Sequence, residues 1–287
     1  MTDIITSIRE SLTGHYPPEE IKSLTRLILE KVFGIPAYKL LFPNSKDIHF
    51  SDKELQLAGQ IVQRLLRHEP IQYIIGTKDF YGMEFKVSPA VLIPRPETEE
   101  LVDRIIRENR HRTGLRILDI GTGSGIIPIT LSKNLLEAAV YACDISPEAL
   151  AIARENAQTL EADVTFFQLD ILDDQAVAVQ LQQPFDLIVS NPPYVLDSEK
   201  AAMEQNVLDY EPEVALFVPD ADPLLFYRQI ARIGLKWLNR PGKLYFEINP
   251  QCSQAICDLL QADEYEDIHP DRDLEQRDRF VTATLTQ

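Results

Sequence analysis

The 287-residue sequence is 45% hydrophobic and 25% charged, which is typical of a globular protein with one large or two ordinary domains. Its longest apolar stretches, such as Ile126–Leu131, are too short to span a membrane, and Met1–Glu10 lacks the apolar core of a signal peptide. The net charge of −17 is uneven: residues 1–78 hold ten Lys/Arg and nine Asp/Glu, whereas residues 79–287 hold 18 and 36. Because nucleic-acid-binding proteins usually present a basic face, this acidic second part disfavours a DNA or RNA substrate.

The cysteines and histidines favour neither a disulfide framework nor a metal site. The cysteines are odd in number and form no Cys-x-x-Cys pair, as expected for reduced residues of a cytoplasmic protein. The histidines are scattered along the chain, so no metal cofactor is expected. The residues concerned are Cys143, Cys252 and Cys257, and His15, His49, His68, His111 and His269.

The first 69 residues have the pattern of a small helical domain. Pro17–Glu20 opens a periodic run of apolar residues that Gly34 ends. A second apolar run begins at Ser51, with Glu54 three residues later, which is the spacing of a capping box.

A different pattern follows from Pro70 to Ile93. Ile71–Ile75, Phe80–Gly82 and Phe85–Val87 are short apolar or aromatic runs separated by Gly76 and other turn residues. We expect these runs to form paired strands. The segment is therefore predicted to be a β-hairpin that links the helices to the rest of the chain.

From about residue 94, strand and helix patterns alternate, which predicts a doubly wound α/β sheet with helices on both faces. The predicted strands are Arg116–Ile120, Val140–Asp144, Val164–Leu169, Phe185–Ser190, Lys243–Ile248 and Phe280–Leu285. The predicted helices between them include Pro147–Leu160, Pro223–Leu238 and Gln251–Ala262. The expected organisation is a helical domain (1–69), a β-hairpin linker (70–93) and an α/β domain (94–287).

A glycine-rich loop follows the first predicted strand of the α/β domain. Three alternate glycines let the backbone approach a ligand closely. A dinucleotide-binding fingerprint would require glycine at position 126, where the chain has Ile126, and this counts against a nicotinamide-dependent oxidoreductase. The register instead resembles the first motif of S-adenosylmethionine-dependent methyltransferases, although a simple strand-to-helix turn is an open alternative. The loop consists of Gly121, Thr122, Gly123, Ser124 and Gly125.

Two aspartates end the next two strands. Asp144 can accept hydrogen bonds from both ribose hydroxyls, because Ser146-Pro147 already provides the cap and first-turn proline of the following helix. Asp170 is suitably placed for an adenine amino group, with Ile171 as an apolar neighbour of the ring; an ordinary loop residue is the alternative. A positively charged sulfonium suits such an acidic pocket. With the glycine loop and Asn191, these residues are predicted to bind S-adenosylmethionine.

The tetrapeptide Asn191-Pro192-Pro193-Tyr194 follows the fourth strand, at the sheet edge where α/β proteins bind ligands. The prolines fix the backbone and remove two donors, so the directions of the carbonyl groups are set in advance. The Asn191 amide and the flat Tyr194 ring complete a site suited to a planar –NH2 group. The alternatives are a turn residue for Asn191 and a core aromatic for Tyr194.

These motifs resemble those of the HemK/PrmC-type protein-(glutamine-N5) methyltransferases of peptide-chain release factors. The resemblance implies a class I (Rossmann-like) S-adenosylmethionine-dependent methyltransferase sheet with a small N-terminal helical domain and a β-hairpin linker. It implies methylation of the glutamine in the Gly-Gly-Gln motif of release factors, by a monomer that acts on protein and not directly on nucleic acid. The segments that carry it are Pro70–Gly76, Phe80–Gly82, Ile93–Glu99, Asn191–Tyr194 and Glu211–Leu216.

In the expected reaction, the Asn191 side-chain oxygen and the Pro192 carbonyl hold the two hydrogens of the glutamine amide. This orientation turns the nitrogen lone pair toward the methyl group, while Tyr194 stacks on the amide and Pro193 lines the substrate site. A nucleic-acid amino-methyltransferase that acts on adenine or guanine shares the tetrapeptide and is the main alternative. A non-catalytic binding module is a third possibility.

Five polar residues near these motifs have no clear role in the sequence. They are Arg95, Glu97, Thr98, Glu211 and Glu247. We expect Thr98 to cap the next helix. For Glu211 and Glu247, we expect structural hydrogen bonds.

Overall fold

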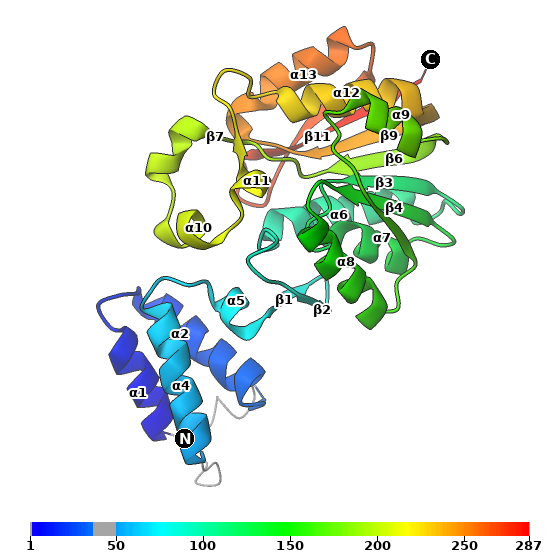
Figure 1. Cartoon of the computed structure of the whole chain (residues 1–287). Coiled ribbons are helices and arrows are strands. Elements are labelled where there is room, and N and C mark those ends of the chain that lie inside the picture. The colour runs from blue at the N-terminus through cyan, green and yellow to red at the C-terminus, as the bar shows by residue number, and fades with distance from the viewer. Residues whose placement is uncertain (1, 37–49, 287) are drawn as a thin grey trace. The chain divides into compact units, whose positions relative to one another are not determined.

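The structure is a computed structural model that describes residues 2–36 and 50–286 (Figure 1). His49 and the other predicted features within residues 37–49 lie outside the described residues. The chain divides into two compact units, Met1–Thr77 with Glu204–Tyr210, and Lys78–Met203 with Glu211–Gln287. The finer division at residues 69/70 and 93/94 stays a prediction.

The first unit consists of helices around their own apolar core, as predicted. Ser51 caps helix α4 by accepting a hydrogen bond from the Glu54 N–H, while the Glu54 carboxylate accepts from the Ser51 N–H at 2.7 Å, which confirms the capping box. Residues such as Leu12, Ile28 and Leu65 are fully buried in this core. The elements are α1 (Thr2–Leu12), α2 (Pro18–Leu27), the π-helix η1 (Ile28–Val32), α4 (Asp52–Leu65), α5 (Ile71–Ile75) and α10 (Gln205–Tyr210).

The prediction of a strand at Ile71–Ile75 was wrong, because this segment is the helix α5. Pro70 precedes it, and the Pro70 carbonyl accepts hydrogen bonds from the N–H groups of residues 73 and 74 at 3.0 and 3.1 Å. Gly76, with φ of 80°, ends the helix in the left-handed conformation. A run of five mostly apolar residues is too short to distinguish strand from helix by periodicity, so the flanking residues decide.

The hairpin itself is confirmed, but it begins after Gly76. Strands β1 (Thr77–Phe80) and β2 (Met83–Lys86) are joined by Tyr81 and Gly82, which both have positive φ, as a tight hairpin turn requires. Phe80 and Phe85 are buried, with an edge-to-face ring contact at 6.1 Å between centroids. They pack into the core under helix α6 (Pro96–Asn109).

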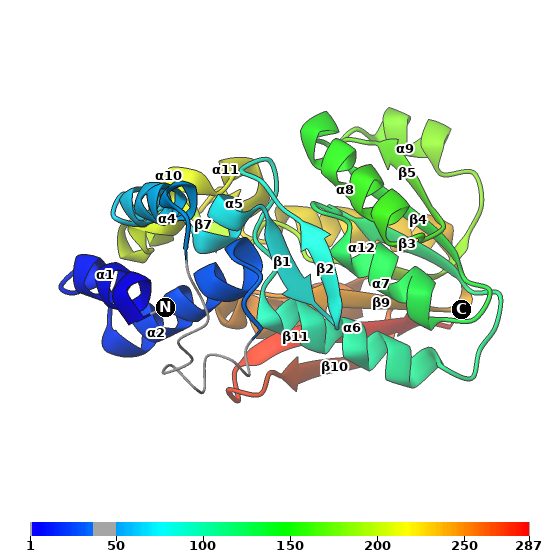
Figure 2. The ribbon, with the colours of Figure 1, turned by 90° about the horizontal axis from the view of Figure 1, so that it is seen from below.

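The second unit is built on a seven-stranded sheet with the order β10-β11-β9-β6-β3-β4-β5. Figure 2 labels each of these strands except β6. The five strands from β9 to β5 are parallel, and β11 pairs antiparallel with both β9 and β10. All six predicted strands occur, and β10 is an additional edge strand. Their bounds are β3 (Arg116–Ile120), β4 (Ala139–Asp144), β5 (Val164–Gln168), β6 (Phe185–Ser190), β9 (Leu238–Glu247), β10 (Glu266–Arg272) and β11 (Asp278–Leu285).

Helices cover both faces of this sheet, as predicted (Figure 1). Along β3, Ile117 belongs to the core beside α6, whereas the next residue, Leu118, belongs to the core on the opposite face. One face carries α6, α7 (Ile126–Asn134) and α8 (Pro147–Thr159). The other carries α9 (Asp174–Gln180), α12 (Leu225–Trp237) and α13 (Ser253–Ala262), which follows the short η3 (Pro250–Cys252).

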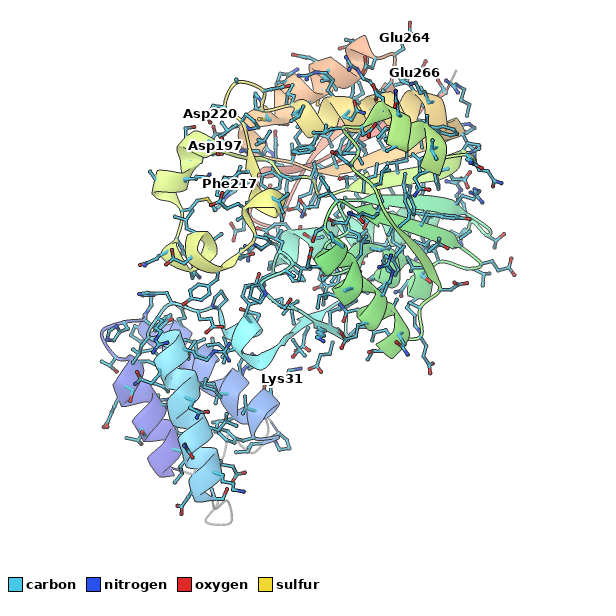
Figure 3. All side chains as sticks on the ribbon, in the orientation of Figure 1. Lys31, Asp197, Phe217, Asp220, Glu264 and Glu266 are labelled. Atoms are coloured by element: carbon cyan, nitrogen blue, oxygen red, sulfur yellow. The ribbon has the colours of Figure 1, made fainter. Side chains whose placement is uncertain are left out.

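A small additional structure leaves the carboxyl end of β6. Strand β7 (Val195–Leu196) pairs parallel with β8 (Phe217–Val218), and η2 (Asp197–Ala202) and α11 (Glu213–Leu216) lie between them in sequence. The Lys200 ammonium lies 4.1 Å from the Phe217 ring centroid and 3.1 Å from Asp197. Figure 3 labels Asp197, Phe217 and Asp220 in this region. Within residues 2–36 and 50–286, no helix is long and apolar enough to cross a membrane.

Candidate active site

A cavity of about 220 Å³ opens where the carboxyl ends of β3, β4, β5 and β6 meet. Strands β3 and β6 are neighbours, and the chain then leads from β3 to α7 on one face and from β6 to α12 on the other. Such a switch point leaves a crevice in an open α/β sheet. The predicted ligand-binding residues lie around it, with the exceptions of Gly125 and Tyr194. The lining includes Gly121, Thr122, Gly123, Ser124, Asp144, Asp170, Ile171, Asn191, Pro192 and Pro193.

The glycine loop forms one wall of the cavity. Gly121 has φ of 76°, and its N–H donates to the Cys143 carbonyl at 2.9 Å, so the loop turns sharply at the end of β3. Gly125 has φ of 80° at the start of α7, and a Cβ there would lie 3.0 Å from both the Ala153 Cβ and the Ile129 Cδ1. Gly125 therefore brings α7 and α8 close together and is not itself part of the cavity lining.

Asp144 fixes the loop from the end of β4. Its carboxylate accepts hydrogen bonds from the Gly123 N–H at 2.8 Å and from the Ser146 N–H at 2.9 Å. Ser146 caps α8 with its own hydroxyl, which accepts from the Ala149 N–H at 3.1 Å, as predicted. Burial raises the pKa of Asp144, and the backbone hydrogen bonds oppose that shift. Asp144 thus orders the loop and still faces the cavity.

The other end of the cavity is formed after β5. Asp170 is exposed, and its side chain accepts a hydrogen bond from the Leu172 N–H at 2.9 Å. Ile171 lies beside it and packs against the core. Phe226 from α12 also lines the cavity and was not predicted. The only sign of it in the sequence is its place within the predicted helix Pro223–Leu238. It gives this part of the wall an aromatic side chain.

The tetrapeptide forms the wall opposite the glycine loop. Asn191 is partly buried, and its Nδ2 donates to the Thr98 hydroxyl at 3.2 Å. Among the described residues, no group donates a hydrogen bond to the Asn191 side-chain oxygen or to the Pro192 carbonyl. Pro193 is partly buried and also lines the cavity. Two acceptor oxygens are therefore available beside the glycine loop.

Tyr194 lies apart from the cavity lining. Its ring packs against the core, and its hydroxyl donates to the Glu247 Oε1 at 3.2 Å. Burial raises the pKa of this hydroxyl. The Asn249 side chain donates to the Tyr194 carbonyl at 3.2 Å, which holds the end of the tetrapeptide. Stacking of Tyr194 on a substrate amide stays a prediction.

The polar residues without a clear role fall into two groups. The buried Glu211 accepts hydrogen bonds from the Ile93 N–H at 3.0 Å and from the Arg95 guanidinium at 2.6 Å, so the pair fixes the segment before α6. Glu247, at the end of β9, accepts from the Thr98 hydroxyl at 2.7 Å. Both glutamates therefore make the structural hydrogen bonds that were expected.

The predicted capping role of Thr98 was wrong. Helix α6 begins at Pro96 after Arg95, so Thr98 lies in its first turn and not at its cap. Pro96 already provides the favourable first residue of the helix. The Thr98 hydroxyl is instead used for the hydrogen bonds with Glu247 and Asn191. Glu97, on the same turn, lies 4.0 Å from the Arg279 guanidinium.

One buried carboxyl was missed by the sequence analysis. Asp119 on β3 is 0% exposed, and neither of its oxygens has a hydrogen-bond partner among the described residues. The buried hydroxyl of Thr122 makes no hydrogen bond of standard geometry to the described residues, but it lies close enough to oppose the rise in the pKa of Asp119. Burial raises the pKa of Asp119 to about 7. The signal in the sequence was an aspartate inside an otherwise apolar buried strand, a position that carries a cost unless a partner binds there.

Two family models match the chain, the Methyltransferase small domain over residues 98–210 and the PrmC N-terminal domain over residues 3–76. The release factor glutamine methyltransferase of Flavobacterium psychrophilum is 42% identical over 283 residues, 98% of this chain and 97% of the relative. That of Bacteroides thetaiotaomicron is 49% identical over 283 residues, 99% of each chain. The chain belongs to the release factor glutamine methyltransferase family.

The fold of this family member also matches a solved structure. A methyltransferase from Pyrococcus furiosus has a TM-score of 0.53 at 17% identity, with 78% of this chain and 98% of that chain covered, which shows a shared fold. The strand order and the helices on both faces confirm the predicted class I methyltransferase sheet. Of the predicted site residues, the structure gathers the glycine loop apart from Gly125, the two aspartates with Ile171, and the first three tetrapeptide residues around one cavity.

Proposed function

We propose that this chain transfers the methyl group of S-adenosylmethionine to the side-chain amide nitrogen of the glutamine in the Gly-Gly-Gln motif of peptide-chain release factors. The observation that carries the proposal is the pair of unpaired acceptor oxygens, on Asn191 and Pro192, in the same cavity as the glycine loop. Two acceptors match the two hydrogens of a carboxamide. Membership of the family supports the choice of a glutamine in a release factor.

The residues of the cavity fit S-adenosylmethionine. Thr122 lines the cavity, and next to it the buried carboxyl of Asp119, which does not itself line the cavity, has a raised pKa that a nearby cationic ligand would lower. Gly121 and Gly123 leave the backbone accessible, while Asp144 is placed for ribose hydroxyls. The exposed Asp170, with Ile171 and Phe226 beside it, would hold adenine. When bound, the cofactor supplies an electrophilic methyl group on a sulfonium.

The role of Asn191 and Pro192 is to orient a weak nucleophile. An amide nitrogen is unreactive because its lone pair is delocalised into the carbonyl group. Acceptance of both N–H hydrogens by the two oxygens fixes the amide plane and favours positive charge on the nitrogen. Correct orientation can contribute about 7–11 kcal/mol in favourable systems, so no strong base in the cavity is needed. The proton is then lost to solvent.

The rest of the molecule suits a protein substrate. The helical segment 1–69, with its nearly balanced charge, is proposed to recognise the release factor. The acidic remainder would repel a free polyanion. We propose that the enzyme acts as a monomer in the cytoplasm.

A methyl-transfer assay tests this function. The purified chain is incubated with labelled S-adenosylmethionine and, in separate reactions, a release factor, tRNA, ribosomal RNA or DNA. We expect label only in the release factor, and mass spectrometry of its Gly-Gly-Gln peptide should find one methyl group on the glutamine side chain. A release factor with glutamate at that position is the control and should remain unlabelled. Label in a nucleic acid, with none in the release factor, would contradict the proposal.

A further inference from the structure

Three buried or partly buried polar side chains from different elements form a chain of hydrogen bonds that ends at the cavity. The Thr98 hydroxyl on α6 lies 2.7 Å from the Glu247 Oε2 and 3.2 Å from the Asn191 Nδ2. Thr98 is 2% exposed and Glu247 is 1% exposed. Water is therefore excluded from the hydroxyl, and protein groups decide where its single hydrogen points.

The chemistry of these groups sets the direction of each hydrogen bond. An ionised carboxylate can only accept, so the Thr98 hydroxyl donates its one hydrogen to Glu247. The hydroxyl oxygen can then only accept from Asn191, which requires the –NH2 group of Asn191 to face Thr98. The Asn191 side-chain oxygen consequently points away from Thr98. While Glu247 is ionised, the direction follows from the hydrogen count and does not depend on how the two ends of the amide are assigned.

We propose that Thr98 and Glu247 are positioning residues that hold Asn191 with its side-chain oxygen toward the substrate amide. The inference rests on the proposed function, because it concerns the substrate acceptor of that reaction. If Asn191 were turned over, its –NH2 group would face the –NH2 group of the substrate, and two donors would meet. A buried donor without an acceptor is costly, so the inverted amide would bind the substrate poorly and would not orient it.

Glu247 is itself held both at its carboxylate and at its backbone. Tyr194 donates to the other oxygen, Glu247 Oε1, at 3.2 Å, and the Tyr227 hydroxyl of α12 donates to the Glu247 backbone carbonyl at 3.1 Å. These contacts leave Oε2 directed at Thr98. Glu247 therefore holds two residues of the tetrapeptide. It binds Tyr194 directly and Asn191 through Thr98.

A double-mutant cycle tests the inference. The four enzymes are the wild type, Thr98→Val, Asn191→Ala and the double variant, and kcat, KM and the cofactor Kd are measured for each. Valine keeps the shape of threonine and removes the hydroxyl. We expect Thr98→Val to lower kcat about tenfold with the cofactor Kd unchanged, as for loss of one buried hydrogen bond. In the Asn191→Ala background the same change should have no further effect on kcat.

Two further variants separate positioning from a structural role. Thr98→Ser keeps the hydroxyl and should retain most of the wild-type kcat. Thr282→Val is the matched control, because Thr282 is also fully buried, has no hydrogen-bond partner for its hydroxyl among the described residues and lies on β11 outside the cavity lining. It should leave kcat unchanged.

The inference is overturned if Thr98→Val keeps the wild-type kcat, or if it lowers kcat equally with and without Asn191. If Thr98→Val does not fold, Glu247→Gln takes its place in the cycle. A glutamine can donate to Thr98, so the direction of the hydrogen bonds is no longer fixed. A wild-type kcat in Glu247→Gln, or an equal decrease with and without Asn191, would then overturn the inference. Failure of the proposed function looks different: the wild type itself would not methylate the release factor.

Discussion

Glu247 carries a buried carboxylate whose protonation state controls the direction of the hydrogen bonds around it. Burial raises its pKa to about 7, while hydrogen bonds from Thr98 and Tyr194 and the charge of Arg279 oppose the shift. The groups that face it are Thr98 and Glu97 from α6, Tyr194 after β6, Tyr227 from α12 and Arg279 from β11. A protonated Glu247 would donate a hydrogen bond to the Thr98 oxygen. The Thr98 hydroxyl could then donate its own hydrogen to Asn191, which favours the orientation in which the Asn191 side-chain oxygen faces Thr98.

The rate of methyl transfer should therefore depend on pH. Because the ionised form of Glu247 is the one that orients Asn191, kcat should rise as the pH increases through about 7. In Glu247→Gln, which does not titrate, this rise should be absent. Single-turnover rates measured between about pH 5.5 and 8.5 at saturating substrates check this. The same acid limb in both enzymes would assign the titration to another group.

The Glu247→Gln substitution should also change the stability of the folded protein. The pKa of Glu247 is raised from 4.5 to about 7 in the folded protein, so its contribution to stability is present below pH 4.5 and is lost as the pH rises through 7. Removal of the charge should thus stabilise the protein relative to the wild type at pH 8, by on the order of 3 kcal/mol, and much less at pH 5. Denaturant unfolding at the two pH values measures this difference.

Asp144 has an observed role in ordering the loop and a proposed role in cofactor binding, and one substitution can separate binding from chemistry. Asp144→Ala removes the acceptor of the Gly123 and Ser146 N–H groups and the proposed ribose contact. We expect the Kd for S-adenosylmethionine to increase roughly 10–150-fold, as for loss of charge-assisted hydrogen bonds of about 1.5–3 kcal/mol, with kcat at saturating cofactor much less affected. Isothermal calorimetry provides the test. An unchanged Kd would remove the ribose assignment.

Among single residues, those predicted from the sequence were the ones whose type and position at a strand end indicate ligand binding. Asp144 ends a strand and Asn191 directly follows one, and parallel strands bring their carboxyl ends to one edge. Thr98 and Glu247 are 149 positions apart in the sequence, and only the packing of α6 against the end of β9 brings them together. Asp119 was missed because one aspartate within an apolar strand indicates neither its partner nor its direction.

At the scale of elements, Gly125 determines how closely α7 approaches α8. Gly125→Ala places a residue with φ of 80° in the left-handed region and brings its Cβ to 3.0 Å from the Ala153 Cβ. Gly114→Ala is a matched control, since Gly114 has φ of 67° and nothing within 4 Å of a Cβ. Both should lose about 1–2 kcal/mol from backbone strain, and Gly125→Ala a further 1–3 kcal/mol from overpacking. Equal unfolding free energies for the two variants would contradict the proposed close contact.

Elements with strong local signals were predicted well, and those fixed by context were not. The capping box at Ser51 and the buried strands β3 and β6 carry their own signals. Strand β10 includes Pro270 and is largely exposed, so it has neither the apolar run nor the regular alternation of a predicted strand. It exists because β11 offers an edge to pair with. The helix at Ile71–Ile75 depended on its neighbours Pro70 and Gly76.

At the scale of the whole second unit, the alternation of strands and helices was enough to predict a doubly wound sheet. The order of the strands was not predictable from that alternation, and it is the order that makes β3 and β6 neighbours. Their adjacency places the glycine loop opposite Asn191, with the Asn191 carbonyl 4.0 Å from the position of a Gly121 Cβ. In the proposed reaction, this arrangement would bring a cofactor on one wall face to face with a carboxamide on the other.

A crystal structure of the enzyme with S-adenosylhomocysteine and a Gly-Gly-Gln peptide tests this arrangement most directly. We expect the glutamine amide to donate one hydrogen to the Asn191 side-chain oxygen and the other to the Pro192 carbonyl, with its nitrogen facing the cofactor sulfur. The Asn191 –NH2 group should remain on Thr98. A glutamine bound away from these two oxygens, or a cofactor bound away from the glycine loop, would contradict the proposed mechanism.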